Sequence, residues 1–173
     1  MITHDEDSPG CACGLWTESR LPVNYRHAFH AGNFADVVKH VALALCFDRL
    51  NAKEAPYRYI DTHAGIGLYD FEGEEAGRSP EWKDGVGRIW EAERGAPESV
   101  RAALAPWLNV IRRLNSGGLQ HYPGSPVLAA ELMRENDALR LCELHPPTVE
   151  LLRQAMGRDK RVKIEERDGF DAL

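Results

Sequence analysis

Short apolar runs that end at a carboxylate recur along the chain and predict the strands of one sheet. Tyr57–Ile60 is rich in residues that favour strands, and Asp61 follows it directly. Two later runs, Leu139–Glu143 and Val162–Glu166, have the same character, and Asp168 lies just beyond the last of them. Helical patterns separate the runs, and this alternation of strand and helix predicts a parallel sheet with right-handed crossovers. The predicted fold class is therefore α/β.

Helix-spaced apolar residues follow Asn33, a good N-cap because its side-chain oxygen can accept the free N–H groups of the first turn. At about 100° per residue these apolar residues share one face, which we expect to be buried. The polar side chains gather on the opposite face, where a lysine and a histidine are adjacent, and this face is a candidate edge of a site. The expected buried residues are Phe34, Val37, Val38, Val41 and Leu45, and the expected polar face holds Asp36, Lys39 and His40.

Two further helices are predicted between the strands. Pro126 suits the first turn of one, and Ser125 just before it can cap the free N–H groups. Pro146 and Pro147 open the other, which is expected to run to about Met156. The expected buried stripe of the earlier helix is Val127, Leu128, Leu132 and Met133.

Residues 70–122 do not follow a simple strand–helix–strand pattern and predict an inserted helical subdomain. Turns are frequent, a helical stretch lies around Ser99–Asn115, and no strand pattern stands out. We expect Trp82, Trp90 and Trp107 to form a small core of their own.

The insertion also explains an unusual spacing. In a nucleotide-binding α/β sheet, the acid that binds the ribose lies about 20 residues beyond the glycine turn. Gly65 and Glu143 are 78 residues apart, and subtracting the 53 residues of the insertion leaves 25. We therefore divide the chain into a disordered leader (1–23), the first helix and strand of the main domain (24–69), the inserted subdomain (70–122) and the continuation of the main domain (123–173).

The turn Gly65-Ile66-Gly67 follows the first strand at once, and glycine lets the backbone approach a polar or anionic cofactor. Ligands of an open α/β sheet lie beyond the carboxyl ends of the strands, where Glu143 can accept both hydroxyls of a ribose. Asp168 and the N–H groups beside it can bind the edge of an adenine. Neither G-x-G-x-x-G nor a P-loop lysine is present, which disfavours a pyrophosphate cofactor and favours S-adenosylmethionine. The other residues expected around this ligand are His63, Lys39 and His40.

The 173 residues are 43% hydrophobic and 28% charged, as in one globular domain. No apolar run approaches a membrane span and no export signal is present, so we expect no membrane association. Cys46 and Cys142 fall in a helical and a strand pattern rather than a disulfide framework, which favours a reducing cytoplasm. The net charge of −6 disfavours a globally basic nucleic-acid binder, although residues 24–58 hold five Lys and Arg against three acids.

Five separated motifs resemble a known enzyme family: YRHAFHAGNFADVVKH, YIDTHAGIGLY, YPGSP, ELHP and RDGF, in this order. They are similar to the bacterial S-adenosylmethionine-dependent methyltransferases that modify one adenine of large-subunit ribosomal RNA at its exocyclic N6 amine. The resemblance covers about residues 24–173 and implies a Rossmann-like methyltransferase domain with an inserted helical subdomain. It implies ribosomal RNA as partner, with Tyr25 touching the RNA; we expect no metal, and a monomer for the full-length protein. The cofactor-binding residues that it implies are Lys39, His40, His63, Ser125, Glu143, Asp168 and Gly169.

The sequence departs from this family in two places. Residues 1–23 have no counterpart, and the sequence reaches Leu173 without the aspartate-proline-proline-tyrosine motif of the family's fourth strand. In the family, the aspartate of that motif holds the target amine, so no catalytic residue is assigned here. We expect this chain alone to bind the cofactor weakly and to transfer no methyl group. The strand Tyr57–Ile60 is expected to keep an unpaired edge.

Three other functions remain open. One is a non-catalytic S-adenosylmethionine-binding fragment, and another is a methyltransferase for a small molecule or a protein, which the net negative charge allows. Cys11 and Cys13 could begin a metal site, but further ligands at the spacing of a zinc finger are missing. The third function is a metal-dependent hydrolase built on His27, His30, His40 and His63.

Overall fold

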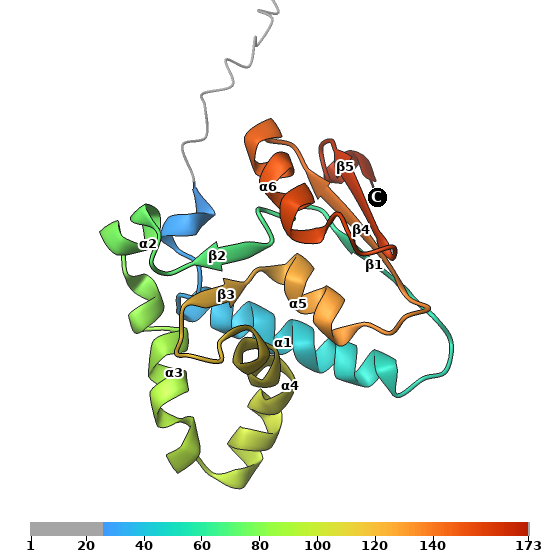
Figure 1. Cartoon of the computed structure of the whole chain (residues 1–173). Helices are drawn as coiled ribbons and strands as arrows, with labels where there is room; N and C mark the ends of the chain where they lie inside the picture. The colour runs from blue at the N-terminus through green and yellow to red at the C-terminus, as the bar shows by residue number, and fades with distance from the viewer. Residues whose placement is uncertain (1–25, 173) are drawn as a thin grey trace, which may run out of the picture.

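A computed structural model describes residues 26–172, so Tyr25 and the leader 1–23 lie outside the described residues. Helices pack beside a small parallel sheet and a separate strand pair (Figure 1). The strands are β1 (Arg58–Asp61), β2 (Leu68–Asp70), β3 (His121–Pro123), β4 (Ala138–Glu143) and β5 (Val162–Glu166). The α-helices are α1 (Phe34–Asn51), α2 (Glu74–Arg78), α3 (Val86–Ala92), α4 (Glu98–Leu114), α5 (Ser125–Leu132) and α6 (Pro146–Met156). Short 3-10 helices span His27–Phe29, Glu81–Lys83, Glu93–Gly95 and Phe170–Ala172.

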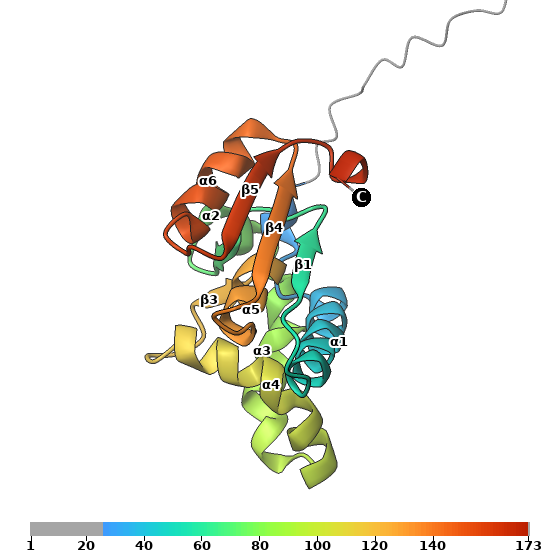
Figure 2. The same ribbon diagram turned by 90° about the vertical axis from the view of Figure 1, so that its right-hand side faces the viewer.

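The three runs that end at carboxylates form one parallel sheet, in the order β1-β4-β5, which confirms the predicted fold class. Each strand begins and ends within one residue of its prediction. In the register, Asp61 lies beside Leu141, and Glu143 beside Glu166. Because the strands run in the same direction, their carboxyl ends lie together at one end of the sheet (Figure 2).

Helices α5 and α6 cover one face of this sheet. Leu139 and Leu141 of β4 are fully buried there, against Leu152 of α6 and Ala129 of α5. Alternate residues of a strand point to the same face, so these two leucines belong to the face that the helices cover. Helix α6 has the predicted bounds, because Pro146 and Pro147 are tolerated in a first turn, where their missing N–H groups cost nothing.

The predicted cap of α5 is wrong by one residue. Gly124 is the N-cap, and Ser125 is the first residue of the helix. The Ser125 hydroxyl makes no capping hydrogen bond; it donates instead to Oδ2 of Asp61 at 2.6 Å. The side chain therefore ties α5 to the end of β1.

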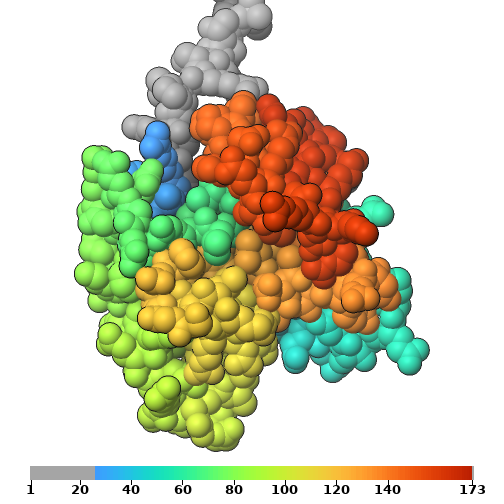
Figure 3. All heavy atoms as spheres, in the orientation of Figure 1, coloured from blue at the N-terminus to red at the C-terminus, as the bar shows by residue number. Residues whose placement is uncertain are grey.

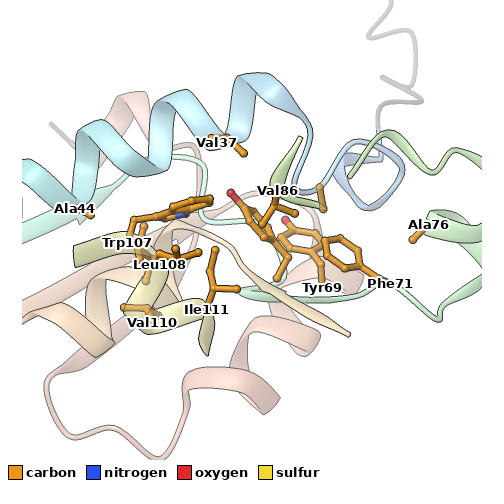
Figure 4. Close-up of a cluster of buried hydrophobic side chains, with 13 residues drawn as sticks. Val37, Ala44, Tyr69, Phe71, Ala76, Val86, Trp107, Leu108, Val110 and Ile111 are labelled. Atoms are coloured by element: carbon orange, nitrogen blue, oxygen red, sulfur yellow. The ribbon is translucent and has the colours of Figure 1, made fainter. Parts of the chain in front are cut away.

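The three tryptophans of the segment 70–122 share one hydrophobic cluster, which is separate from the cluster at the sheet but also includes residues of α1. Strands β2 and β3 pair antiparallel at its two ends, where the sequence showed no strand pattern. Trp107 of α4 is fully buried in a cluster that also contains Val37 and Ala44 of α1 (Figure 4). Trp82 and Trp90 pack against the same cluster. In the space-filling view the helices of this segment, green to yellow, fill the side of the molecule away from the sheet (Figure 3).

The predicted buried face of α1 is wrong for most of its residues. Asn33 caps the helix as predicted, and Val37 is buried, but Phe34 is 74% exposed and Val38 66%. The residues that pack inward include Asp36, 1% exposed, and His40, 6% exposed. Despite the exposed apolar side chains, no helix over residues 26–172 is long and apolar enough to cross a membrane. The other residues of the predicted stripe are Leu45, 41% exposed, and Val41, which is half-buried.

Polar partners explain why the acidic side of α1 is buried. The Asp36 carboxylate accepts the Gly32 N–H at 3.1 Å and lies 2.8 Å from Nε2 of His27 and 2.7 Å from Nζ of Lys39. Burial alone raises the pKa of Asp36, but the hydrogen bonds with His27 and Lys39 outweigh it and hold this pKa well below its usual range. A buried carboxylate with this many donors is stable as an anion.

His40 is buried in its neutral form. Its Nδ1 shares a hydrogen bond of 2.9 Å with the hydroxyl of Tyr122, whose ring stacks on the imidazole at 5.5 Å. Burial lowers the pKa of His40 to about 4, although the nearby Asp36 carboxylate acts in the opposite direction. The histidine therefore stays uncharged at neutral pH.

We expect His40 to make the protein less stable in mild acid. The imidazole of the unfolded chain takes up a proton near pH 6.5, whereas the folded one does so only near pH 4. His40 therefore costs no stability above about pH 6.5, and the folded state loses stability as the pH falls below this value. At pH 5 the loss amounts to about 2 kcal/mol. Urea unfolding at pH 7 and pH 5 measures it, and His40→Gln should flatten this dependence. His145→Gln, at an exposed position, is the control. If the parent chain and both variants lost the same free energy of unfolding between pH 7 and pH 5, the expectation would be wrong.

Candidate functional site

The carboxyl ends of β1, β4 and β5 border a pocket of about 130 Å³. The loops that follow the three strands supply its lining, as expected for a ligand site of an open α/β sheet. Typical small-molecule sites hold about 300 to 1,000 Å³, so this pocket can take only part of a larger ligand. Its lining residues are Thr62, His63, Glu143, Leu144, Asp168, Gly169 and Phe170.

Two backbone N–H groups fix the carboxylate of Glu143. Oε2 accepts the Gly65 N–H at 3.0 Å and Oε1 accepts the His145 N–H at 3.0 Å. Gly65 has φ +64°, and a Cβ there would lie 2.7 Å from the hydroxyl of Tyr69. Glycine is thus favoured over other residues at position 65, whose N–H donates to Glu143. Each carboxylate oxygen has two lone pairs, so both oxygens can accept a further hydrogen bond from a ligand.

Asp61 directly precedes the pocket residues Thr62 and His63 and connects three parts of the chain. It is 8% exposed, and its Oδ2 accepts the Ser125 hydroxyl at 2.6 Å and the Tyr59 hydroxyl at 3.0 Å. Its Oδ1 accepts the N–H of His63 at 3.1 Å. Burial and this carboxylate raise the pKa of Tyr59 well above its usual value, so the phenol remains a donor. Asp61 therefore holds the loop after β1 and the start of α5 in place.

Asp168 and its neighbours form the other wall of the pocket. Oδ1 of Asp168 accepts the N–H of Phe170 at 2.9 Å, while Oδ2 has no hydrogen-bond partner among residues 26–172. A Cβ on Gly169 would lie 2.0 Å from the carbonyl oxygen of Thr62, so only glycine lets the two loops approach this closely. The Phe170 ring is 71% exposed and lies edge-on to His63, with ring centroids 5.3 Å apart.

The pocket combines acceptors with exposed apolar surface. Leu144 follows Glu143 directly and is 53% exposed, and the Phe170 ring is exposed on the other wall. Exposed large apolar side chains beside fixed carboxylates suit a ligand with a flat apolar part and several N–H or O–H donors. Sequence reasoning missed Leu144, Phe170 and Thr62, although each of them lies within two residues of a predicted acid.

The structure brings together only some of the residues predicted to bind the cofactor. His63, Glu143, Asp168 and Gly169 line the pocket, and Ser125 is linked to it through Asp61. The other two, Lys39 and His40, lie on α1 and do not line it; they contact Asp36 and Tyr122, respectively. Tyr25, the residue predicted to touch RNA, lies outside the described residues.

The four histidines of the hydrolase alternative do not meet. His27 is bonded to Asp36, His30 to Glu81 at 2.9 Å, and His40 to Tyr122. His63 contacts Thr62 at the pocket. Over residues 26–172, no group of three or more His, Cys, Asp or Glu side chains could hold a metal ion. Cys11 and Cys13 are not among the described residues; Cys46 is exposed and Cys142 is buried.

A larger hollow of about 290 Å³ lies where the strands begin. Its lining includes Arg58, Arg140, Arg161 and Lys163. Arg161 is already engaged, because its guanidinium contacts Asp159 at 2.5 Å and donates to backbone carbonyls. Ligands of open α/β sheets lie at the opposite, carboxyl ends of the strands, so the smaller pocket is the better candidate site.

Comparison with known proteins identifies the family of the chain. Residues 54–173 match the family model described as "Ribosomal RNA large subunit methyltransferase D, RlmJ". The chain is 44% identical over 152 residues to the Ribosomal RNA large subunit methyltransferase J of Escherichia coli K12, and 41% identical over 153 residues to that of Haemophilus influenzae. These matches cover 87% of the chain but 52% and 53% of the relatives. The chain thus spans about half the length of the curated relatives it matches.

A solved structure shows the same fold. The crystal structure of protein LPL1258 from Legionella pneumophila superposes with a TM-score of 0.74 at 35% sequence identity. The match covers 82% of this chain and 51% of the Legionella chain. The matched region of this chain therefore corresponds to about half of the Legionella chain.

We expect Gly169→Ala to separate the two walls of the pocket. The new methyl group would overlap the Thr62 carbonyl, and since neither backbone can yield cheaply, we expect a loss of about 1 to 3 kcal/mol of stability. Urea unfolding measures this loss, and amide exchange should rise in residues 62–65 and 168–170. Gly77→Ala is the matched control, because a Cβ there meets nothing within 4 Å. If both variants were equally stable, the close approach of the two loops would be wrong.

Proposed function

This chain belongs to the RlmJ family of ribosomal RNA large subunit methyltransferases, and we propose that its pocket binds the adenosine part of S-adenosylmethionine for methylation of one adenine at N6. The observation that carries the proposal is that two carboxylates at strand ends, Glu143 and Asp168, line one pocket together with the exposed side chains of Leu144 and Phe170. As the chain spans about half of its relatives, the activity of the whole enzyme is itself part of the proposal.

The residues of the pocket suit an adenosine. Glu143, fixed by two N–H groups, accepts the two ribose hydroxyls with its remaining lone pairs. Asp168 accepts the adenine amine through Oδ2, and the base lies between Leu144 and Phe170. Charged acceptors bind such donors about twice as strongly as neutral ones. The proposed contacts with the ribose and the adenine thus come from the end of β4 and from the loops after β4 and β5.

When bound, the cofactor supplies a methyl group on a positively charged sulfonium. In this proposal Ser125 and Lys39 lie toward its amino-acid end, with Asp61 as the support that positions Ser125. His40 is buried and bonded to Tyr122, so its part is to position α1 rather than to touch the ligand.

Ribosomal RNA is the proposed substrate, met in the cytoplasm. An adenine must leave its stack to reach a pocket of this kind, which costs a few kcal/mol. The amine is a weak nucleophile until an acceptor holds its N–H atoms, and the printed sequence contains no aspartate-proline-proline-tyrosine motif to provide one. We therefore propose that this chain alone binds the cofactor without transferring a methyl group.

A labelling experiment tests the activity. Ribosomal RNA from a strain that lacks this modification is incubated with methyl-labelled S-adenosylmethionine and this chain, with the Escherichia coli relative as positive control. We expect label in N6-methyladenine only with the relative. Label in the RNA with this chain alone would show that it carries its own catalytic acceptor, whereas label in a protein or a small molecule would reject the substrate.

We expect Glu143→Gln and Asp168→Asn each to weaken cofactor binding by about tenfold or more, because a neutral amide loses the charge-assisted hydrogen bonds. Isothermal titration calorimetry of this chain with S-adenosylmethionine measures the dissociation constants. Glu150→Gln is the matched control, an exposed glutamate on α6 outside the pocket. If all three variants bound like the parent chain, or if none bound at all, the assignment of the pocket would be rejected.

A further inference from the structure

Asp36 carries a buried charge that the ligand pocket does not use. It is 1% exposed although it lies in the first turn of α1. Its carboxylate lies 3.1 Å from the Gly32 N–H, 2.8 Å from Nε2 of His27 and 2.7 Å from Nζ of Lys39. Two of these partners precede the helix, and the third lies within it. Asn33 already caps α1 through its side chain, so the helix does not require the charge of Asp36 in order to begin.

The ion pair with Asp36 fixes the position of Lys39. The Lys39 side chain is 62% exposed, and Asp36 is its only ion-pair partner within residues 26–172. An ammonium group has three N–H donors, so two of them stay available for a ligand. An exposed lysine loses rotamer freedom when it binds a ligand, and a partner that holds the side chain beforehand removes most of this loss. Asp36 therefore presents a positioned cation near the start of α1.

The same end of α1 adjoins the glycine turn of the pocket. The His27 ring, held by Asp36, lies edge-on to the Tyr69 ring with centroids 5.3 Å apart. The Tyr69 hydroxyl packs against Gly65, where a Cβ would lie 2.7 Å from it. Gly65 in turn donates its N–H to Oε2 of Glu143. A chain of direct contacts thus connects Asp36 to the carboxylate that is proposed to bind the ribose.

We propose that Asp36 is a positioning residue, which acts through Lys39 on the carboxylate of the cofactor's amino-acid part. The inference rests on the proposed function, in which the adenosine part occupies the pocket. Of residues 26–172, two carboxylates and no lysine or arginine line that pocket, so the anionic group of the ligand needs a donor from elsewhere. Lys39, held in place, provides it. Asp36 itself is too deeply buried to touch the ligand.

Two matched ligands test the proposal. S-adenosylhomocysteine and 5′-methylthioadenosine share the adenosine and the thioether, and only the former carries the amino-acid part. Isothermal titration calorimetry measures the dissociation constants of both. We expect Asp36→Asn to weaken binding of S-adenosylhomocysteine about threefold to tenfold, the effect of fixing one long side chain, and to leave 5′-methylthioadenosine unaffected. Asp48→Asn, at an exposed position of the same helix, is the matched control and should change neither constant.

The sign of the change separates positioning from charge. Without the negative charge of Asp36, the Lys39 ammonium attracts an anion more strongly, so tighter binding of S-adenosylhomocysteine by Asp36→Asn would overturn the proposal. An equal loss with both ligands would show a general structural role, and no change with either would show no role, so each would overturn it as well.

A double-mutant cycle checks that Asp36 acts through Lys39. In the Lys39→Met background, Asp36→Asn should leave the ratio of the two dissociation constants unchanged, because the side chain that it positions is gone. If Asp36→Asn changed this ratio by the same factor with and without the lysine, the two residues would act independently and the proposal would be wrong.

A measurement on the parent chain decides the matter even if Asp36→Asn does not fold. NMR relaxation of the ε-methylene groups compares Lys39 with Lys160, an exposed lysine that has no ion-pair partner in the described part of the chain. We expect the ε-methylene of Lys39 to be the more rigid on the ps–ns timescale, because the ion pair restricts it. Equal mobility of the two groups would overturn the proposal.

The two ligands also separate this inference from the proposed function. A parent chain that bound neither ligand would reject the pocket as an adenosine site, and the inference with it. A parent chain that bound 5′-methylthioadenosine as tightly as S-adenosylhomocysteine would reject the inference alone, because the amino-acid part would then have no binding site.

Discussion

The candidate site depends on the hydrogen bonds that the buried carboxylate of Asp61 accepts. It accepts hydrogen bonds from Tyr59 within β1, from the loop that follows β1 and from the first residue of α5. These donors come from positions 59, 63 and 125, and the helical segment 70–122 separates the last of them from the other two along the chain. A buried charge is stable only when donors surround it, so the requirement that Asp61 be satisfied also fixes these segments relative to one another. The pocket above it follows from that arrangement.

The acids at the strand ends therefore have different tasks, although they look alike in the sequence. Asp61 is turned inward and holds the scaffold, whereas Glu143 is fixed by backbone N–H groups at the pocket and Asp168 keeps one oxygen for a ligand. Burial decides between the roles, because Asp61 is 8% exposed and already accepts three hydrogen bonds from its own chain, which leaves little of this carboxylate accessible to a ligand. In this sheet, one of the three acids at the strand ends therefore holds neighbouring segments together, and the other two line the pocket.

Sequence reasoning succeeded where local patterns decide the structure. The parallel strands and α6 follow from apolar runs, proline positions and alternation, all of which depend on neighbouring residues. It failed for α1, because the partners that allow Asp36 and His40 to be buried include Tyr122, which is 82 residues from His40. Hydrophobicity alone assigns such residues to the surface. The acids of the pocket were found from strand ends, but Leu144 and Phe170 became recognisable only once their exposure was known.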